Sequence, residues 1–416
     1  MKNESRCRIT VAIPTRNRAF YLRYALESCR LQPAQDFQYL VVDNNSEDDT
    51  SAVCIGFEKD PRFKYVKYES IGNINDQFAR CLEHADGEWL TIIGDDDCIF
   101  QDFGALIEVA IKQADSHSVN CLTWDACIYR WSSFSGRERN FFKWFGLNNR
   151  FGFGADQMVF RVASDFLASI GSNLKLLYQA PGVYHKACRV TALRELVEKF
   201  GREEVFFHSA DISVSAHFIA SGETAIHLRQ PLSITGYSGE STGASHSVGK
   251  NDSVSARYFS ENPDAKPDYV QLLRVSHLLN PQQTILTEIG VTFLIVSKVF
   301  QRHGIVSPTV NEYVRNEIGN APKLSPEGRL GLRELIQVLV SQYKLKISEQ
   351  ELLPLSSKAL QRSLPDPERE IRYEPTAIMA DGKELIRLEQ TMDGSQHSIY
   401  SILDAACYCY FQLRFK

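Results

Sequence analysis

Three consecutive aspartates at the end of a short apolar run constrain this chain more than any other feature. Residues 89–93 form the run WLTII, and Gly94 separates it from Asp95, Asp96 and Asp97. A short apolar run bounded by glycine is typical of a buried strand, and an open α/β sheet binds its ligands beyond the carboxyl ends of its strands. Three carboxylates at one strand end repel one another unless a cation lies among them, and hard oxygen ligands suit Mg²⁺ or Mn²⁺. A solvated acidic turn is the alternative, because aspartate is common in turns.

Two other short apolar runs, residues 9–13 and 37–42, also end in polar residues. The clusters that follow them are residues 14–18 (PTRNR) and 43–46 (DNNS). Helices are predicted after both runs, and strands that alternate with helices indicate a parallel sheet with crossover connections. Because the carboxyl ends of parallel strands meet at one edge of a sheet, the three polar clusters are expected to converge there. The predicted fold class is therefore α/β.

Three segments, in this order and spacing, resemble the family 2 glycosyltransferases of the GT-A fold, whose nucleotide-sugar-binding domain is Rossmann-like. They are residues 11–17 (VAIPTRN), 41–50 (VVDNNSEDDT) and 85–97 (ADGEWLTIIGDDD). The resemblance implies a nucleotide-sugar donor and a divalent cation, Mn²⁺ or Mg²⁺, held by a DxD-type motif. It also implies inversion at the anomeric carbon of the transferred sugar.

The resemblance further implies donor-binding roles for single residues. Asp43, at the end of the second strand, would accept a hydrogen bond from the imide N–H of the nucleobase, which favours uracil or thymine. Pro14, Thr15 and Arg16 match the turn that lies beside the base and ribose. Asn75 or Asp76 matches the position of a further base contact. One departure is Asn44, which stands where the family usually has a second acid.

Within the aspartate triplet, the resemblance favours Asp97 as the direct metal ligand. Asp95 would act through a ribose hydroxyl or a metal-bound water, and Asp96 is counted among the donor-binding residues. Gly94 stands where many family members carry an acid. The division of roles among the three aspartates is therefore left open.

Direct displacement at the sugar requires a base that takes the proton from the incoming hydroxyl. In the family this base is an Asp or Glu well downstream, at the start of a helix, and Asp211 matches that position. Asp211 could equally be an ordinary cap or first-turn acid. The strand predicted at residues 224–228 and Pro231 repeat the order of the family and favour catalysis.

Three further side chains are candidates for acceptor contacts: His208, His185 and Trp144. For His208 the alternatives are a contact with the diphosphate or a half-buried structural histidine, and for His185 a place in an ordinary strand. For Trp144 they are a small aromatic core or a membrane surface. Residues 235–246, rich in Gly and Ser, resemble a mobile loop that closes over the diphosphate in this family and sometimes supplies a histidine, here His246, to the metal. A linker into the next domain is the alternative for this segment.

The length of 416 residues supports two domains. We expect a GT-A catalytic domain over residues 1–250 and a mainly α-helical C-terminal domain over residues 251–416. Predicted helices of the second domain, such as residues 326–343, carry an amphipathic stripe but no catalytic motif. This domain is expected to bind the acceptor, to form a homodimer through its helices or to dock at a membrane.

Composition narrows the choice of partners and location. A net charge of −5 argues against nucleic acid as the main partner. Ten scattered cysteines without a CxxC pair indicate reduced thiols rather than disulfides or a zinc site. The polar residues 1–8 predict no signal peptide, and the longest apolar run, residues 291–296, is too short to span a bilayer. A cytoplasmic protein is therefore expected, with peripheral contact at the inner face of the cell membrane left open.

The predicted function is transfer of a sugar from a UDP-sugar to a glycan, a lipid-linked glycan or another hydroxyl acceptor, in bacterial surface-polysaccharide biosynthesis. A sugar nucleotidyltransferase is the alternative enzyme, but it would normally need a glycine-rich loop after the first strand, and residues 14–18 contain no glycine. A catalytically silent scaffold that binds nucleotide-sugar or glycan is the non-enzymatic alternative. Four intact acids argue against that alternative: Asp43, Asp95, Asp97 and Asp211.

Overall fold

The computed structural model describes the N-terminal part of the chain almost continuously and the C-terminal part in short stretches. The described residues are 7–134, 141–147, 158–164, 166, 180–207, 209–239, 241, 296, 299–305, 314–315, 318–319, 329, 332–333, 336–337, 340–341, 344–355, 376–380, 383–393 and 401–406. Contacts divide the chain into two compact units. The first comprises Met1–Ala163, Tyr178–Ser241 and Ile371–Lys416, and the second comprises Ser164–Leu177 and Thr242–Glu370. The division at residues 250 and 251 stays a prediction, and the grouping of the last 46 residues with the first unit was not expected from local sequence.

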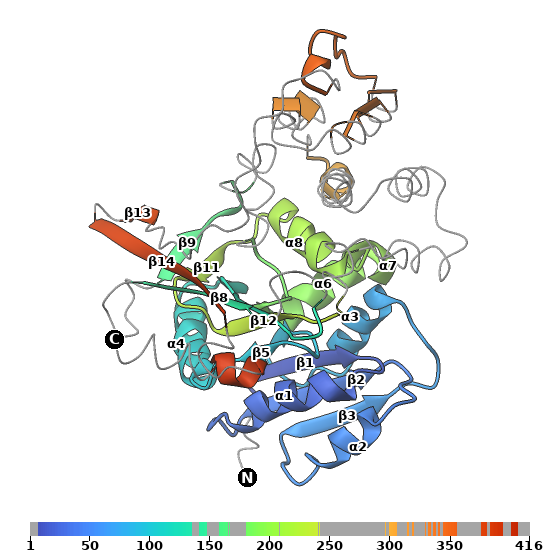
Figure 1. Ribbon diagram of the computed structural model, residues 1–416, viewed down its shortest axis with the longest axis vertical. Coiled ribbons are helices and arrows are strands. Elements are labelled where there is room, and N and C mark those ends of the chain that lie inside the picture. The colour runs from blue at the N-terminus through green and yellow to red at the C-terminus, as the bar shows by residue number, and fades with distance from the viewer. Residues whose placement is uncertain are drawn as a thin grey trace. The chain divides into compact units, whose positions relative to one another are not determined.

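The first unit is built on an eight-stranded mixed sheet of order β3-β2-β1-β4-β10-β6-β11-β9. Figure 1 shows β1, β2 and β3 of this sheet side by side. Its strands are β1 (Ile9–Thr15), β2 (Phe37–Asp43), β3 (Phe63–Lys67), β4 (Trp89–Ile92), β6 (Cys121–Trp124), β9 (Met158–Arg161), β10 (Lys186–Arg189) and β11 (Ala225–Leu228). The strands β3, β2, β1 and β4 are parallel, whereas β10 is antiparallel to both of its neighbours. The α/β class is therefore confirmed, but a purely parallel sheet was wrong beyond β4. Crossover helices enforce parallel pairing only where strands follow one another closely, and β10 returns to the sheet after a long excursion.

Helices cover both faces of this sheet. They are α1 (Ala19–Arg30), α2 (Thr50–Ile55), α3 (Ile74–Glu83), α4 (Phe103–Ser116), α6 (Val190–Phe200), α7 (Arg202–Val205) and α8 (Ala210–Ala220). Alternate strand residues enter two different cores, because strand side chains alternate between faces. Val11 and Val41 pack in the core that contains α1 and α4, whereas Ala12 and Leu40 pack in the core that contains α3 and α8. Both faces of the sheet are thus closed to ligands, and its edge beyond the strand ends is the place left for a site.

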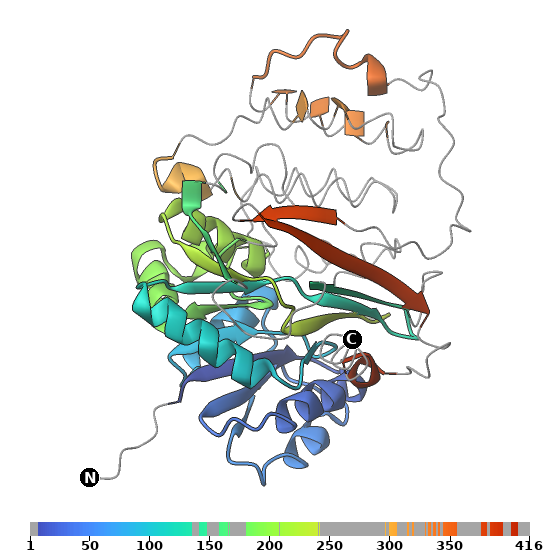
Figure 2. The same ribbon diagram turned by 90° about the vertical axis from the view of Figure 1, so that its left-hand side faces the viewer.

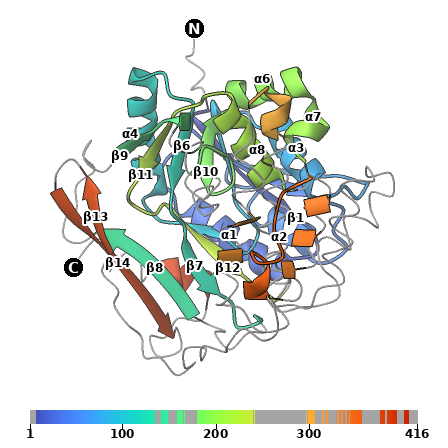
Figure 3. The ribbon, with the colours of Figure 1, turned by 90° about the horizontal axis from the view of Figure 1, so that it is seen from above.

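A second, six-stranded sheet has the order β13-β14-β8-β7-β12-β5. Its strands are β5 (Cys98–Ile99), β7 (Cys127–Arg130), β8 (Phe141–Leu147), β12 (Ser233–Tyr237), β13 (Thr376–Ala380) and β14 (Lys383–Asp393). The long strand β14 runs antiparallel beside β8, as the red arrow next to the teal strand shows in Figures 2 and 3. Ile402 and Ala405 are buried in the same core cluster as Tyr129 and Trp131. Residues far along the chain therefore complete the first unit.

The structure describes too little of the second unit to test the predicted helical domain. Residues 299–302 are helical there, and a single 3₁₀ turn, η4, spans Leu353–Leu355. Near the C-terminus, residues 402–406 are helical and lie in the first unit. Within the described ranges, no helix has the length and apolar character needed to cross a bilayer.

Candidate functional site at the carboxyl edge of the sheet

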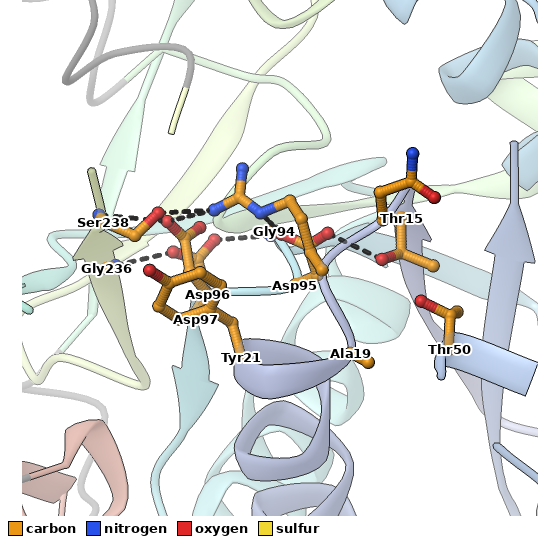
Figure 4. Close-up of polar contacts among 12 residues, drawn as sticks. Thr15, Ala19, Tyr21, Thr50, Gly94, Asp95, Asp96, Asp97, Gly236 and Ser238 are labelled. Atoms are coloured by element: carbon orange, nitrogen blue, oxygen red, sulfur yellow. Dashed lines mark hydrogen bonds and ion pairs between the residues drawn. The ribbon is translucent and has the colours of Figure 1, made fainter. Parts of the chain in front are cut away.

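The three aspartates lie in the turn between β4 and β5, residues 94–97, which we call the acidic turn. The neighbouring parallel strands end beside it, since the β1–β2 register pairs Thr15 with Asp43. Thr15 Oγ1 donates a hydrogen bond of 2.7 Å to Asp95 Oδ2 (Figure 4). The predicted convergence of polar strand ends at one sheet edge is thus seen directly.

Asp97 is the most enclosed of the three acids, with none of its surface exposed. Its Oδ1 accepts the Gly236 N–H at 2.7 Å, from strand β12. Its Oδ2 accepts three donors: the Gly94 N–H at 2.5 Å, the Tyr184 hydroxyl at 2.9 Å and His185 Nε2 at 2.9 Å. Burial alone would raise the pKa of Asp97, but the imidazole and the backbone N–H groups outweigh it and lower the pKa. The carboxylate is therefore ionised and held by the protein itself.

His185 is in turn fixed from its other side. Its Nδ1 lies 2.7 Å from Ser233 Oγ, and that oxygen also accepts the Trp124 indole N–H at 2.8 Å. Because Ser233 Oγ accepts from the indole, its own hydrogen is free to point at Nδ1, which leaves Nε2–H to donate to Asp97. His185 is 6% exposed, and its predicted contact with an acceptor stays a prediction.

Asp95 and Asp96 share a different partner, the guanidinium of Arg18. Arg18 Nε lies 3.0 Å from Asp95 Oδ1, and Arg18 Nη2 lies 2.6 Å from Asp96 Oδ2. Asp96 Oδ2 also accepts the Ser238 N–H at 3.2 Å (Figure 4). Arg18 donates to Ser238 Oγ at 2.7 Å. Burial raises the pKa of Asp96 to about 7 and raises the pKa of Asp95, although the guanidinium opposes this effect.

The end of β2 is a second polar cluster. Asp43 is fully buried, and its carboxylate accepts the Ser46 N–H at 2.8 Å and the Tyr65 hydroxyl at 2.6 Å. Asn44 exchanges two hydrogen bonds of 2.7 Å with the backbone of Gly72. The departure from a second acid at Asn44 therefore has a structural reason, because the amide both donates to and accepts from Gly72, whereas an ionised carboxylate only accepts.

The other predicted base contacts lie at the start of α3. Asp76 closes a capping box with Asn73, so helix capping explains this acid without a ligand. Asn75 Oδ1 is buried, and none of the described residues hydrogen-bonds it. Pro14 is half-buried at the end of β1, and Arg16 is exposed just beyond that strand.

Asp211 is the second residue of α8 and lies beside a buried lysine. Lys186 is 8% exposed, and its Nζ lies 3.4 Å from Ser215 Oγ, which donates to the Asp211 backbone oxygen at 2.9 Å. Burial raises the pKa of Asp211 and the Lys186 ammonium opposes it, while burial lowers the pKa of Lys186 to about 8. Burial, and then the carboxylates of the acidic turn and of Asp211, raise the pKa of Tyr184. Asp211 and the acidic turn thus both raise the pKa of the Tyr184 hydroxyl.

Three predicted contacts lie outside what the structure describes. His208 and His246 are not among the described residues, and for Trp144 only the backbone, on β8, is described. Conversely, sequence reasoning assigned no role to Arg18 or Lys186. Arg18 belongs to the polar cluster after the first strand, so its charge beside a predicted acidic cluster was an available signal. The sequence contained no comparable signal for Lys186, because the burial of this lysine depends on how α8 packs beside it.

A divalent cation fits the chemistry of the acidic turn. Within the described part of the chain, no group of three or more His, Cys, Asp or Glu side chains forms a ready metal cage. Mg²⁺-type sites, however, commonly use only one or two carboxylates together with substrate phosphates. Asp95 and Asp96 supply adjacent hard oxygen donors of this kind, whereas the Asp97 oxygens already take four donors.

Comparison with known proteins is consistent with this geometry. Residues 10–169 match the family described as Glycosyl transferase family 2. A relative from Campylobacter jejuni, the GalNAc(5)-diNAcBac-PP-undecaprenol beta-1,3-glucosyltransferase, is 33% identical over 124 residues, which are 28% of this chain and 38% of that protein. The chain therefore matches well under half the length of this curated relative. Over residues 10–169 the chain matches a glycosyl transferase family 2 domain, in agreement with the family resemblance predicted from its motifs.

Two solved structures show more distant similarity. S. aureus TarS 1-349 in complex with UDP-GlcNAc is 18% identical, with a TM-score of 0.41, over 80% of this chain and 81% of that chain. The mannosyltransferase PcManGT from Pyrobaculum calidifontis, in complex with GDP-Man and Mn²⁺, is 17% identical, with a TM-score of 0.36, over 84% and 86%. TM-scores this low do not establish residue correspondences. The α/β, GT-A-like assignment therefore follows from the family match and the observed sheets.

Proposed function

We propose that this protein is an inverting glycosyltransferase that moves a sugar from a UDP-sugar to a hydroxyl acceptor. One observation carries the proposal: two of the family motifs, at the ends of β1 and β4, meet through the bonds from Thr15 and Arg18 to the acidic turn. Asp43 lies at the adjoining end of β2, in register with Thr15. A nucleotide that spans this edge would place its base near Asp43 and its diphosphate near the acidic turn.

In this proposal Asp95 and Asp96 hold the divalent cation. This revises the direct role predicted for Asp97, whose four internal hydrogen bonds favour a supporting role. A cation held by these two residues would supply positive charge that stabilises a diphosphate leaving group. The protein's own groups position the donor: Thr15 and Arg18 lie at the carboxylates that would bear the cation. Asp43, each of whose oxygens takes one hydrogen bond, would accept a further one from the imide N–H of uracil.

Asp211 is the proposed base. Its carboxylate takes the proton of the acceptor hydroxyl while the acceptor oxygen bonds to the anomeric carbon. The bond from that carbon to the diphosphate oxygen breaks, and its electron pair leaves with the nucleoside diphosphate. Because attack and departure occur on opposite sides, the anomeric configuration inverts. Lys186 favours the ionised form of Asp211, which is the form a base requires.

A lipid-linked glycan is the acceptor class we propose, in bacterial surface-polysaccharide assembly. The support is the printed name of the Campylobacter jejuni relative, which specifies an undecaprenol-linked glycan. A cytoplasmic enzyme with peripheral membrane contact would meet both the nucleotide-sugar donor and a lipid-linked acceptor. Dimer formation through the C-terminal helices is proposed only from the sequence.

Calorimetric titration with UDP and with GDP, each with and without Mn²⁺, tests the donor site. UDP binding that is tighter in Mn²⁺ supports the proposal, whereas GDP preference would overturn the role of Asp43. Absence of binding to either nucleotide, in folded protein, would favour the scaffold. Release of pyrophosphate from UTP and a sugar 1-phosphate would favour the nucleotidyltransferase.

The base is tested by Asp211→Asn, with UDP release from a panel of UDP-sugars as the readout. We expect UDP affinity to stay within about twofold and turnover to fall by roughly 10²-fold or more. Glu203→Gln, at an exposed first-turn acid of α7, is the matched control and should leave both unchanged. Normal turnover in Asp211→Asn would show that another group takes the proton.

A further inference from the structure

Arg18 stands at the entrance of α1 with its side chain folded onto the acidic turn. It is the residue before the first helical residue, and its side chain is 14% exposed. The guanidinium contacts oxygens of two different carboxylates, Asp95 Oδ1 at 3.0 Å and Asp96 Oδ2 at 2.6 Å. It also donates to Ser238 Oγ at 2.7 Å, and its central carbon lies 5.3 Å from the centre of the Tyr21 ring.

This arrangement solves an electrostatic problem of the cation-free site. Asp95 and Asp96 are 4% and 5% exposed, and a buried carboxylate without a compensating charge is strongly destabilising. A planar guanidinium can face two carboxylates at once, which an ammonium group does less well. Arg18 therefore supplies positive charge at the position where a divalent cation would supply it.

The guanidinium and a divalent cation would compete for the same oxygens. A Mg²⁺-type ion requires carboxylate oxygens at about 2.0–2.1 Å, and two positive groups that share those oxygens repel each other. Cation binding must therefore move the guanidinium away from at least one carboxylate. A diphosphate gives the displaced guanidinium a new partner, because its fork of donors matches phosphate oxygens.

We propose that Arg18 occupies the cation position of the donor site and transfers to the diphosphate when cation and nucleotide bind together. This inference rests on the proposed function and assigns a coupling role to Arg18. Each ligand alone binds weakly, since the cation displaces the guanidinium from its carboxylate partners and the nucleotide finds it already paired with carboxylates. Because coupling between two ligands is reciprocal, Mn²⁺ raises the affinity for UDP by the same factor as UDP raises the affinity for Mn²⁺.

The test measures binding of Mn²⁺ alone, by electron paramagnetic resonance of the free ion, in nucleotide-free protein. Arg18→Gln removes the competing charge and should bind Mn²⁺ about tenfold more tightly than the unmodified protein. The same variant should bind UDP in Mn²⁺ about tenfold more weakly, because the diphosphate loses its guanidinium. With UDP affinity in the absence of Mn²⁺ unchanged, the factor by which Mn²⁺ improves UDP binding should therefore shrink by about tenfold.

Arg23→Gln is the matched control, since Arg23 is an exposed arginine on the same helix that stacks on Phe20. It should behave as the unmodified protein in all three measurements. Arg18→Lys keeps the positive charge and replaces Arg18→Gln in the test if that variant does not fold. The lysine variant should bind Mn²⁺ alone more tightly than the unmodified protein, because an ammonium group bridges two carboxylates less well.

The outcomes separate this inference from the proposed function. Mn²⁺-dependent UDP binding in the unmodified protein, with no gain in Mn²⁺ affinity in either Arg18 variant, would overturn the role of Arg18 and leave the donor site standing. No UDP binding by the unmodified protein under any condition would overturn both.

Discussion

Tyr184 and His185 are consecutive residues, yet both donate to the same atom, Asp97 Oδ2, each at 2.9 Å. Neighbouring side chains of an extended strand point to opposite faces, so a regular strand could not bring both to one oxygen. His185 has a φ of 49°, in the left-handed region that non-glycine residues rarely adopt. This conformation costs about 1–2 kcal/mol and turns the imidazole toward the acidic turn. The two donors to Asp97 therefore depend on one strained residue.

We predict that His185→Gly is more stable than His185→Ala by about 1 kcal/mol. Both variants lose the imidazole, but only glycine adopts the left-handed conformation without strain. Urea unfolding measures the difference. The same pair at His227, a buried histidine in the middle of β11 that is not among the positive-φ residues, is the control, and there alanine should be the more stable variant. Greater stability of alanine at both positions would contradict the strain argument.

Asp97→Asn should lower the free energy of unfolding by about 3–5 kcal/mol. The variant replaces an acceptor-only carboxylate with an amide whose NH₂ group meets N–H or O–H donors, and it removes the charge that they stabilise. Denaturant unfolding provides the measurement. Asp49→Asn, at an exposed aspartate whose side chain makes no cap bond, should change stability by no more than about 0.5 kcal/mol. A loss below about 1 kcal/mol at Asp97 would show that its bonds do not hold the turn.

Gly236→Ala should separate β12 from the acidic turn. A Cβ at Gly236 would lie 1.8 Å from the Asp96 backbone oxygen and 2.9 Å from Trp131 Nε1, so backbone must move. We expect a loss of about 3 kcal/mol or more, with weaker binding of Mn²⁺ and UDP, because Gly236 and Ser238 both donate to aspartates of the turn. Gly319→Ala, where no atom lies within 4 Å, is the control for thermal unfolding. Equal melting temperatures of the two variants would refute the close contact.

Lys186→Met should flatten the dependence of stability on pH between about pH 8 and 10.5. Burial lowers the pKa of Lys186 to about 8, even though nearby Asp211, Cys121 and Asp125 favour its charged form. An unfolded lysine titrates near pH 10.4, so in this interval the unfolded state binds more protons and stability rises with pH. Below about pH 8 the cost of the buried charge is constant. Lys186→Met removes the rise.

Urea unfolding at several pH values measures this slope. Lys59→Met, at an exposed lysine, should keep the slope of the unmodified protein. An unchanged slope in Lys186→Met would contradict the lowered pKa of Lys186.

The local sequence predicted the part of the fold that local pattern controls. The apolar runs before residues 14, 43 and 94 became β1, β2 and β4, and the helices predicted after the first two runs are α1 and α2. Short-range periodicity is sufficient here because crossover helices dictate parallel pairing of strands that are close in sequence. The acidic turn and the meeting of polar strand ends follow from the same rule.

Only the tertiary structure decided which residues surround the three acids. Asp97 meets His185 across 88 residues and Gly236 across 139, and Arg18 reaches Ser238 across 220. The strand β14 likewise joins β8 from more than 230 residues away. Such contacts depend on how antiparallel strands and the second sheet pack, and no periodicity within a segment records that. The sequence by itself thus determined the α/β frame and the location of the acids, whereas packing determined that Asp97 is enclosed and that Asp95 and Asp96 face an arginine.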